Sequence, residues 1–524
     1  MTVANRGRRA ALAALLVPFW TAAAHGAELG LTLDDAVARA LEKNTTIRVE
    51  REGLSAAESA VRGSRGIYDP LVTLESGWGR VSEPVNSSFS GAPLGQAAPT
   101  FGAIQSALTV QQLLPTGGTL SLRASGARQT SDGTFTLLSP AYATRLGFEL
   151  RQPLFRSRKV ARSTIRVASF DRDRASASLR SEIANTVTGV ERAYWHLNAA
   201  RREVGVREEA LKLAEEQLGE TKIRVEQGVS AEAEVAQPRA ELERRRGEML
   251  ASREAVARAE NALKLLILDD RETDLWVAPV VPKDAAEIET VPADPAGWMD
   301  KALSSRPEIE AAQAVLDRRR VETELARERA RPTVDAVASY DRHGLAGEPN
   351  PSAGPPPGGG ALVVPPNIDG GWGRSVGTLT DGDFSTARVG LVLQLPIGNR
   401  TAKANVAIAG SAERQAEIQL AQARQAVRAD VMDAAAALET AGQRIAAARS
   451  AREAAEVQLS AERDRFAAGL STNFLVLTRQ NDLSRARLDE IASIHDYRTA
   501  RTGVARATGT LLQERAIKVE EEGK

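Results

Sequence analysis

Residues that could carry chemistry are present in this sequence, but they form no catalytic or metal-binding pattern. Cysteine is absent, which excludes disulfides, thiolate metal sites, cysteine nucleophiles and a lipid-modified N-terminal cysteine. Asp and Glu are numerous, and at helical spacing most belong to solvated faces and intrahelical ion pairs. The histidines lie far apart, without the spacing of metal ligands: His25, His196, His343 and His495. We predict no catalytic residue, no metal, no cofactor and no enzyme activity.

Two similar turns are the most distinctive local features. Arg224 to Ser230 reads RVEQGVS, and Arg465 to Ser471 reads RFAAGLS. In each, a glycine suits the left-handed position that ends a helix, and a serine suits the cap of the next helix. Each turn therefore predicts a tight helical hairpin.

Unusually long helices must position these turns. About 70 residues before the first turn contain no proline, which predicts a rod of roughly 105 Å. Its apolar residues recur every seven positions, as in a coiled-coil seam: Ile183, Val190, Leu197, Val204, Leu211, Leu218 and Val225. The segment before the second turn repeats this pattern, with Arg452 as a polar exception: Val431, Leu438, Ile445, Leu459 and Phe466.

The helices that follow the turns continue the same seam. Its members are Val235, Leu242, Met249, Val256 and Leu263, then Val476, Leu483, Tyr497 and Val504. Pro238 is expected about two turns into the first return helix, where it should kink that helix.

The chain is an internal duplication, because the segments before the rods also occur twice. The sequence from Leu31 and the sequence from Trp298 both read as a short helix, a polar break and a second amphipathic stretch. RLGFELRQPLF from Arg145 and RVGLVLQLPIG from Arg388 then match as strands with one apolar and one polar face. Such strands suit a barrel wall between lipid and water, or a soluble sandwich.

The two halves differ in the segments that connect their strands, and a linker joins one half to the other. The first half has a surplus segment from Ser106 with a turn at Pro115 to Gly118, which predicts an additional hairpin. The second half is rich in Pro and Gly from Gly347 to Gly373, which predicts a disordered loop. Asp269 to Pro295 holds several prolines and reads as a linker or a small equatorial patch.

Composition and the N-terminal segment indicate the cell compartment in which the protein is expected. Arg6, Arg8 and Arg9 precede an apolar run and small residues up to Ala24, which predicts a cleavable signal peptide; about 15 apolar residues are too few for a membrane anchor. The net charge is zero, so no nucleic-acid partner is expected. The mature chain is then either soluble in the periplasm or inserted as a β-barrel.

The order of these features resembles the TolC-like outer membrane efflux protein family over essentially the whole mature chain. The resemblance rests on LTLDDAVARALEKNTTI from Leu31, RQPLF from Arg151, the twin turns QGVS and AGLS, and the duplication. It implies an α+β membrane protein in which a trimeric outer-membrane β-barrel is continued by a long periplasmic α-helical coiled-coil barrel. Each protomer would supply about four strands, or about six with the additional hairpin, giving about twelve or about eighteen in all.

The resemblance also implies where function lies. The two turns would form the periplasmic entrance, which gates the channel and docks on an adaptor protein: Gly228, Val229, Ser230, Gly469, Leu470 and Ser471. Around a threefold axis, Glu232 and Glu234 would form an acidic ring, although acidic residues in a first helical turn also simply stabilise a helix dipole. Some relatives carry aspartates where this chain has Leu475 and Thr478, so a second acidic ring is not expected.

These observations predict an outer-membrane exit duct of a Gram-negative cell. Its expected partners are two further copies of itself, outer-membrane lipid, a periplasmic adaptor (membrane fusion) protein and an inner-membrane RND or ABC pump, in efflux or in type I secretion. The alternative is a soluble periplasmic coiled-coil adaptor or scaffold.

The predicted segments are the signal peptide 1–24, short helices 25–70, strands 71–155, a helical hairpin 156–270, the linker 271–295, short helices 296–331, strands 332–398, a second hairpin 399–512 and a tail 513–524.

Overall fold

The computed structural model describes residues 28–86, 91–93, 95–155, 158–229, 231–284, 288, 292–355 and 363–517. The predicted signal peptide and His25 lie outside this part of the chain. The chain divides into two compact units. The first contains the segments up to Ile47, Ile183–Pro295 and Met432–Arg506; the second contains Arg48–Glu182, Ala296–Val431 and the segment from Ala507.

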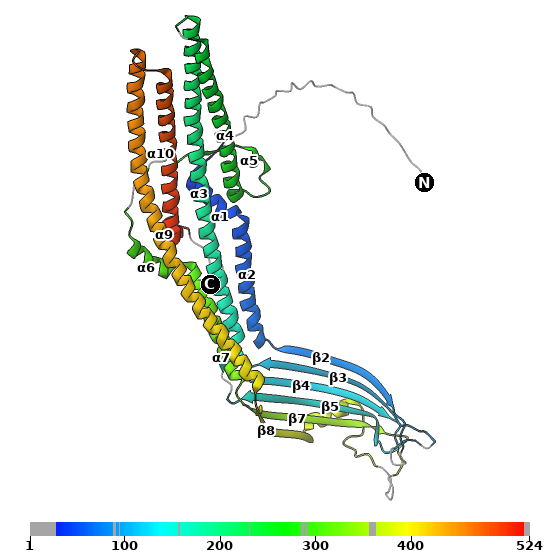
Figure 1. The fold of residues 1–524 in the computed structure, drawn as a ribbon. Coiled ribbons are helices and arrows are strands. Elements are labelled where there is room, and N and C mark those ends of the chain that lie inside the picture. The colour runs from blue at the N-terminus through cyan, green and yellow to red at the C-terminus, as the bar shows by residue number, and fades with distance from the viewer. Residues whose placement is uncertain are drawn as a thin grey trace, which may run out of the picture. The chain divides into compact units, whose positions relative to one another are not determined.

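Four long helices carry the two hairpins (Figure 1). Helix α3 (Arg158–Glu226) has 69 residues and α9 (Arg400–Ala467) has 68, and they are followed by α4 (Ala236–Ile267) and α10 (Asn473–Thr508). The predicted seam is confirmed, because most of its apolar residues are buried: Ile183, Val190, Leu197, Leu218, Leu242, Met249, Leu263, Val431, Leu438, Ile445, Leu459, Val476, Leu483 and Tyr497.

The polar exception in the seam is held by ion pairs. Arg452 reaches Glu456 on its own helix at 2.9 Å and Glu490 on α10 at 2.7 Å. A half-buried guanidinium needs such partners, since an unpaired charge is costly away from water. Arg452 therefore joins α9 to α10 by charge where the other seam residues do so by apolar packing.

The kink expected at Pro238 is wrong. The chain first forms a 3₁₀ turn, η2 (Glu232–Val235), and α4 begins only at Ala236. Pro238 thus lies in the first turn of α4, where no intrahelical bond needs its missing N–H.

The short helices meet the ends of the return helices in the same way in both halves. Between α1 (Leu33–Lys43) and α2 (Thr45–Arg65), the Asn44 side chain donates a hydrogen bond to the carbonyl of Leu266 at the end of α4, at 3.2 Å. Between α6 (Pro295–Ser305) and α7 (Pro307–Arg329), the Ser305 hydroxyl donates to the carbonyl of Thr508 at the end of α10, at 2.8 Å. These bonds satisfy carbonyls that a helix end leaves free.

The linker forms a small packed patch in the first unit. Strands β1 (Leu29–Leu31) and β6 (Val280–Pro282) pair in parallel, next to the short helix α5 (Thr273–Val277). The buried Tyr194 of α3 donates a hydrogen bond from its hydroxyl to the carbonyl of Leu31 at 3.1 Å and also contacts Asp284. Burial and the bond to Asp284 raise the pKa of Tyr194 beyond its ordinary value, so its hydroxyl stays protonated.

Six antiparallel strands form one sheet in the second unit, in the order β2-β3-β4-β5-β7-β8. Their bounds are β2 Leu71–Ser82, β3 Thr100–Leu113, β4 Thr119–Ser131, β5 Leu138–Pro153, β7 Thr333–Pro349 and β8 Phe384–Gln394. The surplus segment of the first half forms β3 and β4, so the additional hairpin joins the same sheet. The other short elements are η1 (Gly66–Tyr68) and α11 (Leu511–Glu514).

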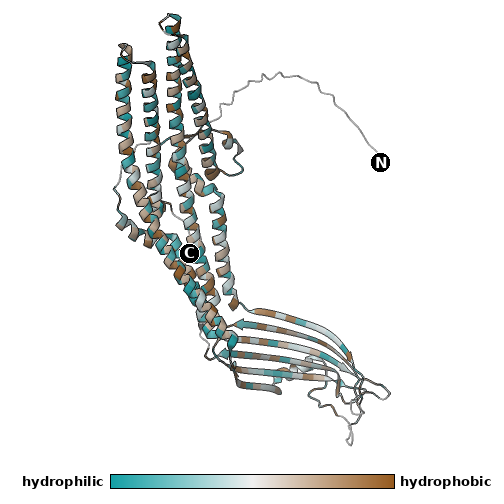
Figure 2. Ribbon diagram, viewed as in Figure 1, coloured by the Kyte–Doolittle hydropathy of each residue, from teal (hydrophilic) through white to brown (hydrophobic). Residues whose placement is uncertain are grey.

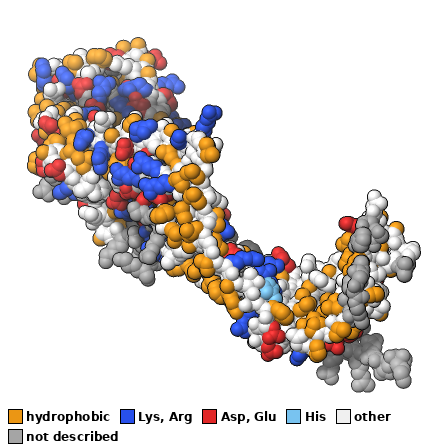
Figure 3. All heavy atoms as spheres, turned by 90° about the horizontal axis from the view of Figure 1, so that it is seen from below, with side chains coloured by type: hydrophobic (Ala, Val, Ile, Leu, Met, Phe, Trp, Pro, Cys, Tyr) orange, Lys and Arg blue, Asp and Glu red, His pale blue; other side chains and the backbone are white. Residues whose placement is uncertain are grey.

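The two faces of this sheet differ in polarity, as alternation along the strands requires. Figure 2 shows hydrophobic and hydrophilic residues alternating along the strands, and Figure 3 shows patches of hydrophobic side chains on the surface. One face carries exposed apolar side chains such as Leu74, Leu146 and Val389, the last 89% exposed. The opposite face carries charge, including the pair of Arg145 with Asp341 at 2.9 Å.

The predicted disordered loop is partly wrong. Strand β7 continues to Pro349, Gly347 pairs with Asp369 in an isolated bridge, and Trp372 begins a helix, α8 (Trp372–Asp381). The helix is hard to predict because Gly373 and Gly377 lower its intrinsic helix propensity. Residues 356–362 of the predicted loop lie outside the described residues. None of the helices in the described part is both long and apolar enough to cross a membrane.

Candidate functional site at the hairpin turns

The two turns end their helices with the same hydrogen-bond pattern. Gly228 has a φ of 73°, its N–H donates to Val225 O at 2.9 Å, and the next N–H, of Val229, donates to Arg224 O at 2.9 Å. Gly469 has a φ of 74°, and the corresponding bonds join Gly469 to Phe466 at 3.0 Å and Leu470 to Arg465 at 2.8 Å. This is the Schellman arrangement, in which a left-handed glycine satisfies the last carbonyls of a helix.

Each glycine is followed by an apolar side chain that points into solvent. Val229 is 71% exposed and Leu470 is 74% exposed. An isolated exposed apolar residue is common, but the same position of both repeats presents one here, and Phe474 and Leu475 beside the second turn are exposed as well. The turns are therefore apolar tips on otherwise charged helices.

The serine of the second turn differs from the expected helix cap. Ser230 lies outside the described residues. Ser471 does not cap α10, which begins at Asn473; its hydroxyl instead donates a short hydrogen bond to Glu462 of α9. Glu462 is buried, and a buried carboxylate needs a donor, so this bond takes precedence over capping.

The acidic residues of the first tip lie on the surface. Glu232 and Glu234 belong to η2, and both are exposed. In the second hairpin, Leu475 is exposed and the Thr478 hydroxyl donates to the carbonyl of Phe474 at 2.8 Å. The acidic ring at the first tip stays a prediction, since it depends on how copies of the chain assemble.

Polar contacts join the two hairpins just behind the tips. The Gln217 side chain of α3 donates to Asn473 Oδ1 at the start of α10, at 2.6 Å. The Arg224 guanidinium lies over the Phe466 ring, 4.9 Å from its centroid. Further along, Arg487 of α10 pairs with Glu209 of α3 at 2.7 Å. These contacts hold one hairpin against the other, and each is weak enough to break and re-form.

The structure brings together two histidines that the sequence separates. His196 of α3 and His495 of α10 have ring centroids 5.5 Å apart. Burial and, secondarily, the neighbouring His196 lower the pKa of His495, so its ring is neutral at pH 7. No signal in the sequence pairs these residues, because only the packing of α3 on α10 does so. Within the described residues, no group of three or more His, Asp or Glu side chains could hold a metal ion.

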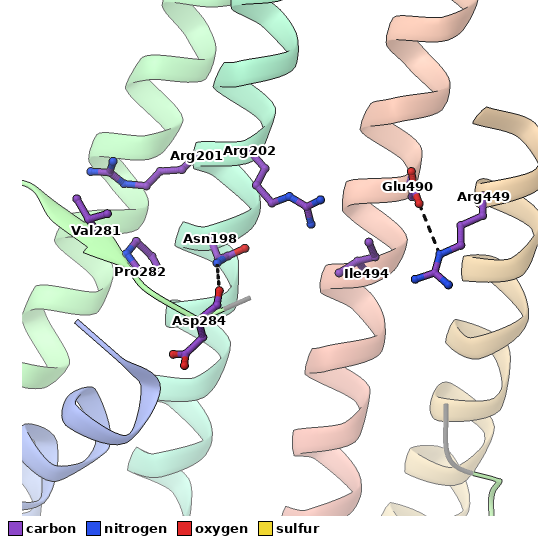
Figure 4. Close-up of a pocket in the computed structure, with 9 residues that line it drawn as sticks. All are labelled: Asn198, Arg201, Arg202, Val281, Pro282, Asp284, Arg449, Glu490 and Ile494. Atoms are coloured by element: carbon purple, nitrogen blue, oxygen red, sulfur yellow. Dashed lines mark hydrogen bonds and ion pairs between the residues drawn. The ribbon is translucent and has the colours of Figure 1, made fainter. Parts of the chain in front are cut away.

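A cavity of about 630 Å³ lies in the first unit between α3, α10 and the linker strand (Figure 4). Its polar groups are largely matched to one another. Asn198 donates to the carbonyl of Asp284 at 3.3 Å, and Arg449 pairs with Glu490 at 3.6 Å. Arg201 pairs with Glu260 at 2.7 Å. The side chain of Arg202, which also lines the cavity, makes no hydrogen bond or ion pair with another described residue.

Comparison with known proteins identifies the family to which this chain belongs. The sequence profile of the outer membrane efflux proteins matches residues 105–267 and 298–510, which together are more than half of the chain. The chain belongs to the outer membrane efflux protein family. It is accordingly an outer-membrane efflux channel protein, and this assignment favours the predicted channel over the soluble adaptor.

Solved channels share the fold of this family member at low sequence identity. CusC, whose structure concerns folding and transmembrane channel formation, has a TM-score of 0.66 at 15% identity, covering 91% of this chain and 92% of that one. The outer membrane channel CmeC of Campylobacter jejuni gives 0.63 at 14%, covering 91% and 86%. VceC of Vibrio cholerae gives 0.61 at 15%, covering 91% and 96%. The search of curated protein sequences finds no match.

Proposed function

We propose that three copies of this chain form the exit duct of a tripartite efflux pump or a type I secretion system. The strands would form one barrel in the outer membrane, and the long helices would form a tunnel in the periplasm. The tips would be the gated entrance where a periplasmic adaptor protein and an inner-membrane RND or ABC pump engage the channel. Transport through such a duct is passive and requires no catalytic residue.

The observation that carries this proposal is a sheet that is incomplete in one chain. Its edge strands β2 and β8 have no outer neighbour in the described residues, and one face is covered with exposed apolar side chains. An open edge is not tolerated in lipid, because its N–H and C=O groups find no partner there. Pairing β8 of one copy with β2 of the next would close the sheet. Three copies of a six-stranded sheet would give about eighteen strands, the larger of the two predicted barrels.

The tip geometry supports the proposed gate. The contacts of Gln217 with Asn473 and of Arg224 with Phe466 tie the two hairpins of one chain together behind the tips. Release of these contacts would let one hairpin move away from the other and widen the entrance. The exposed Val229 and Leu470 would give an adaptor protein an apolar point of contact on each hairpin.

Disulfide cross-linking tests the assembly, because the natural chain has no cysteine to interfere. Double variants with one cysteine in β2 and one in β8 are oxidised in cell membranes and separated by denaturing electrophoresis. We expect at least one registered pair to give covalently linked trimers. A matched control pairs cysteines in β3 and β7, which are not edge strands, and it should remain monomeric. If no β2 and β8 pair links one copy to another, the proposed barrel closure is wrong.

A further inference from the structure

Helix α8 is packed against the sheet by its polar side. The Thr144 hydroxyl donates to the carbonyl of Ser375 at 3.0 Å, and the Thr378 hydroxyl accepts from Leu345 N at 3.1 Å. Ser375 and Thr378 are both buried. A soluble protein normally buries the apolar side of an amphipathic helix, so this orientation is unusual.

Glycines in the strands make room for this contact. A Cβ added at Gly344 would lie 2.0 Å from the Ser375 carbonyl oxygen, and one at Gly126 would lie 2.0 Å from the Trp372 ring. Gly126 pairs with Thr144, and Thr144 pairs with Gly344. The three residues therefore form one row across the sheet, on the face that also carries the exposed apolar residues.

The apolar side of α8 is partly exposed: Trp372 and Val376 reach the surface, whereas Leu379 is half-buried against Gly344 of β7. Trp372, Val376 and Leu379 are spaced four and three residues apart, so they form one stripe along the helix. Trp372 is 47% exposed and Val376 is 38% exposed. Trp372 also packs edge-on against Tyr142 of β5, with ring centroids 6.3 Å apart. The stripe thus continues the apolar face of the sheet.

The position of α8 along the strands corresponds to the outer boundary of a membrane. The exposed apolar face begins near the pair of Val334 with Leu393. From Thr333 to Gly344, a strand covers roughly 36 Å, which is about 28 Å along the membrane normal at a tilt of about 40°. The apolar band of an outer-membrane barrel is about 25 Å tall, with aromatic residues at its edges.

Helix α8 also covers an edge that β8 leaves open. Pairing of β8 with β7 ends at His343, so Leu345 lies beyond it. The Thr378 hydroxyl takes the place of a strand partner for the Leu345 N–H. Such a substitute is needed where lipid, rather than water, surrounds the strand.

We propose that α8 is an interfacial helix whose exposed Trp372 and Val376 insert between the acyl chains at the outer boundary of the membrane. The occupant of this surface is lipid, because the stripe is continuous with the apolar face that would contact lipid throughout the barrel. This inference rests on the proposed function, since it requires the sheet to be embedded in the membrane.

Spin labels on single cysteines test the inference in the full-length channel, reconstituted in vesicles of phosphatidylethanolamine and phosphatidylglycerol. The labels are placed by Val376→Cys on the stripe and by Gly377→Cys on a side of α8 that faces away from both the stripe and the sheet, where an added side chain meets open space. Relaxation by O2 reports lipid, and relaxation by a water-soluble nickel chelate reports water. We expect the ratio of O2 to nickel accessibility to be severalfold higher for Val376→Cys than for Gly377→Cys.

Two benchmark positions separate failure of this inference from failure of the proposed function. A label at Leu391→Cys, on the apolar face of β8, is the reference for lipid. A label at Leu470→Cys, at an exposed hairpin tip, is the reference for water. A label that reports lipid at Leu391 and water at Val376 overturns only the role of α8. Low accessibility to both reagents at Val376, with lipid at Leu391, means that a neighbouring subunit covers the stripe and also overturns it. Water at Leu391 overturns the embedded sheet itself, and the role of α8 with it.

Discussion

The variant Gln217→Ala should shift the proposed gate toward its open state. The Gln217 amide is buried and donates to Asn473 at 2.6 Å, which ties α3 to the start of α10. Removing one such hydrogen bond costs about 1 kcal/mol. If the three copies open together, the closed state of the trimer loses about 3 kcal/mol, which corresponds to a roughly 100-fold change in the ratio of open to closed channels.

Single-channel recording in planar bilayers measures this ratio directly. The open fraction of Gln217→Ala should rise strongly over that of the natural chain. The matched control is Glu243→Gln, because Glu243 pairs only with Arg246 on its own helix among the described contacts and ties no two hairpins together. The control should keep the natural open fraction. If the two variants open equally often, the contact behind the tips does not hold the gate.

Three further predictions concern the tips, the histidine pair and α8. Gly228→Val and Gly469→Val force a β-branched residue into a left-handed conformation, so drug tolerance should fall in a strain that depends on this channel, while detergent extraction shows unchanged insertion. Because burial lowers the pKa of His495, its neutral form is favoured in the folded state, and stability should be lost as pH falls below about 6.5. Thermal unfolding followed by circular dichroism should show this loss, and His495→Gln should flatten it. Gly344→Val overpacks the contact with α8 and should cost about 1–3 kcal/mol in denaturant unfolding, whereas Gly390→Val has open space and should not.

The long helices could be predicted because their signal is local and repeated. A seven-residue period over so many turns is typical of a coiled coil, and most of the seam residues are buried as expected. Arg452 interrupts the apolar period, and the sequence alone does not explain it, because its partner Glu490 lies on another helix. The additional hairpin of β3 and β4 was visible as alternation, but its place in the sheet depends on pairing between distant segments.

The features that escaped prediction depend on tertiary packing. Helix α8 contains two glycines and faces the sheet with its polar side, so neither propensity nor the usual burial pattern indicates it. Serine at position 471 suits a helix cap, but its hydroxyl donates a hydrogen bond to the buried Glu462 instead. His196 and His495 meet only because α3 packs on α10. The turns at the tips could be predicted from their glycines, whereas their role as a gate stays a proposal.

The mass of the protein extracted from membranes in detergent tests the channel proposal most directly. Multi-angle light scattering, corrected for bound detergent, gives the number of chains in each particle. The open edges of the sheet predict particles of three chains that require detergent to stay in solution. A monomer that is soluble without detergent would contradict both the closed barrel and the duct.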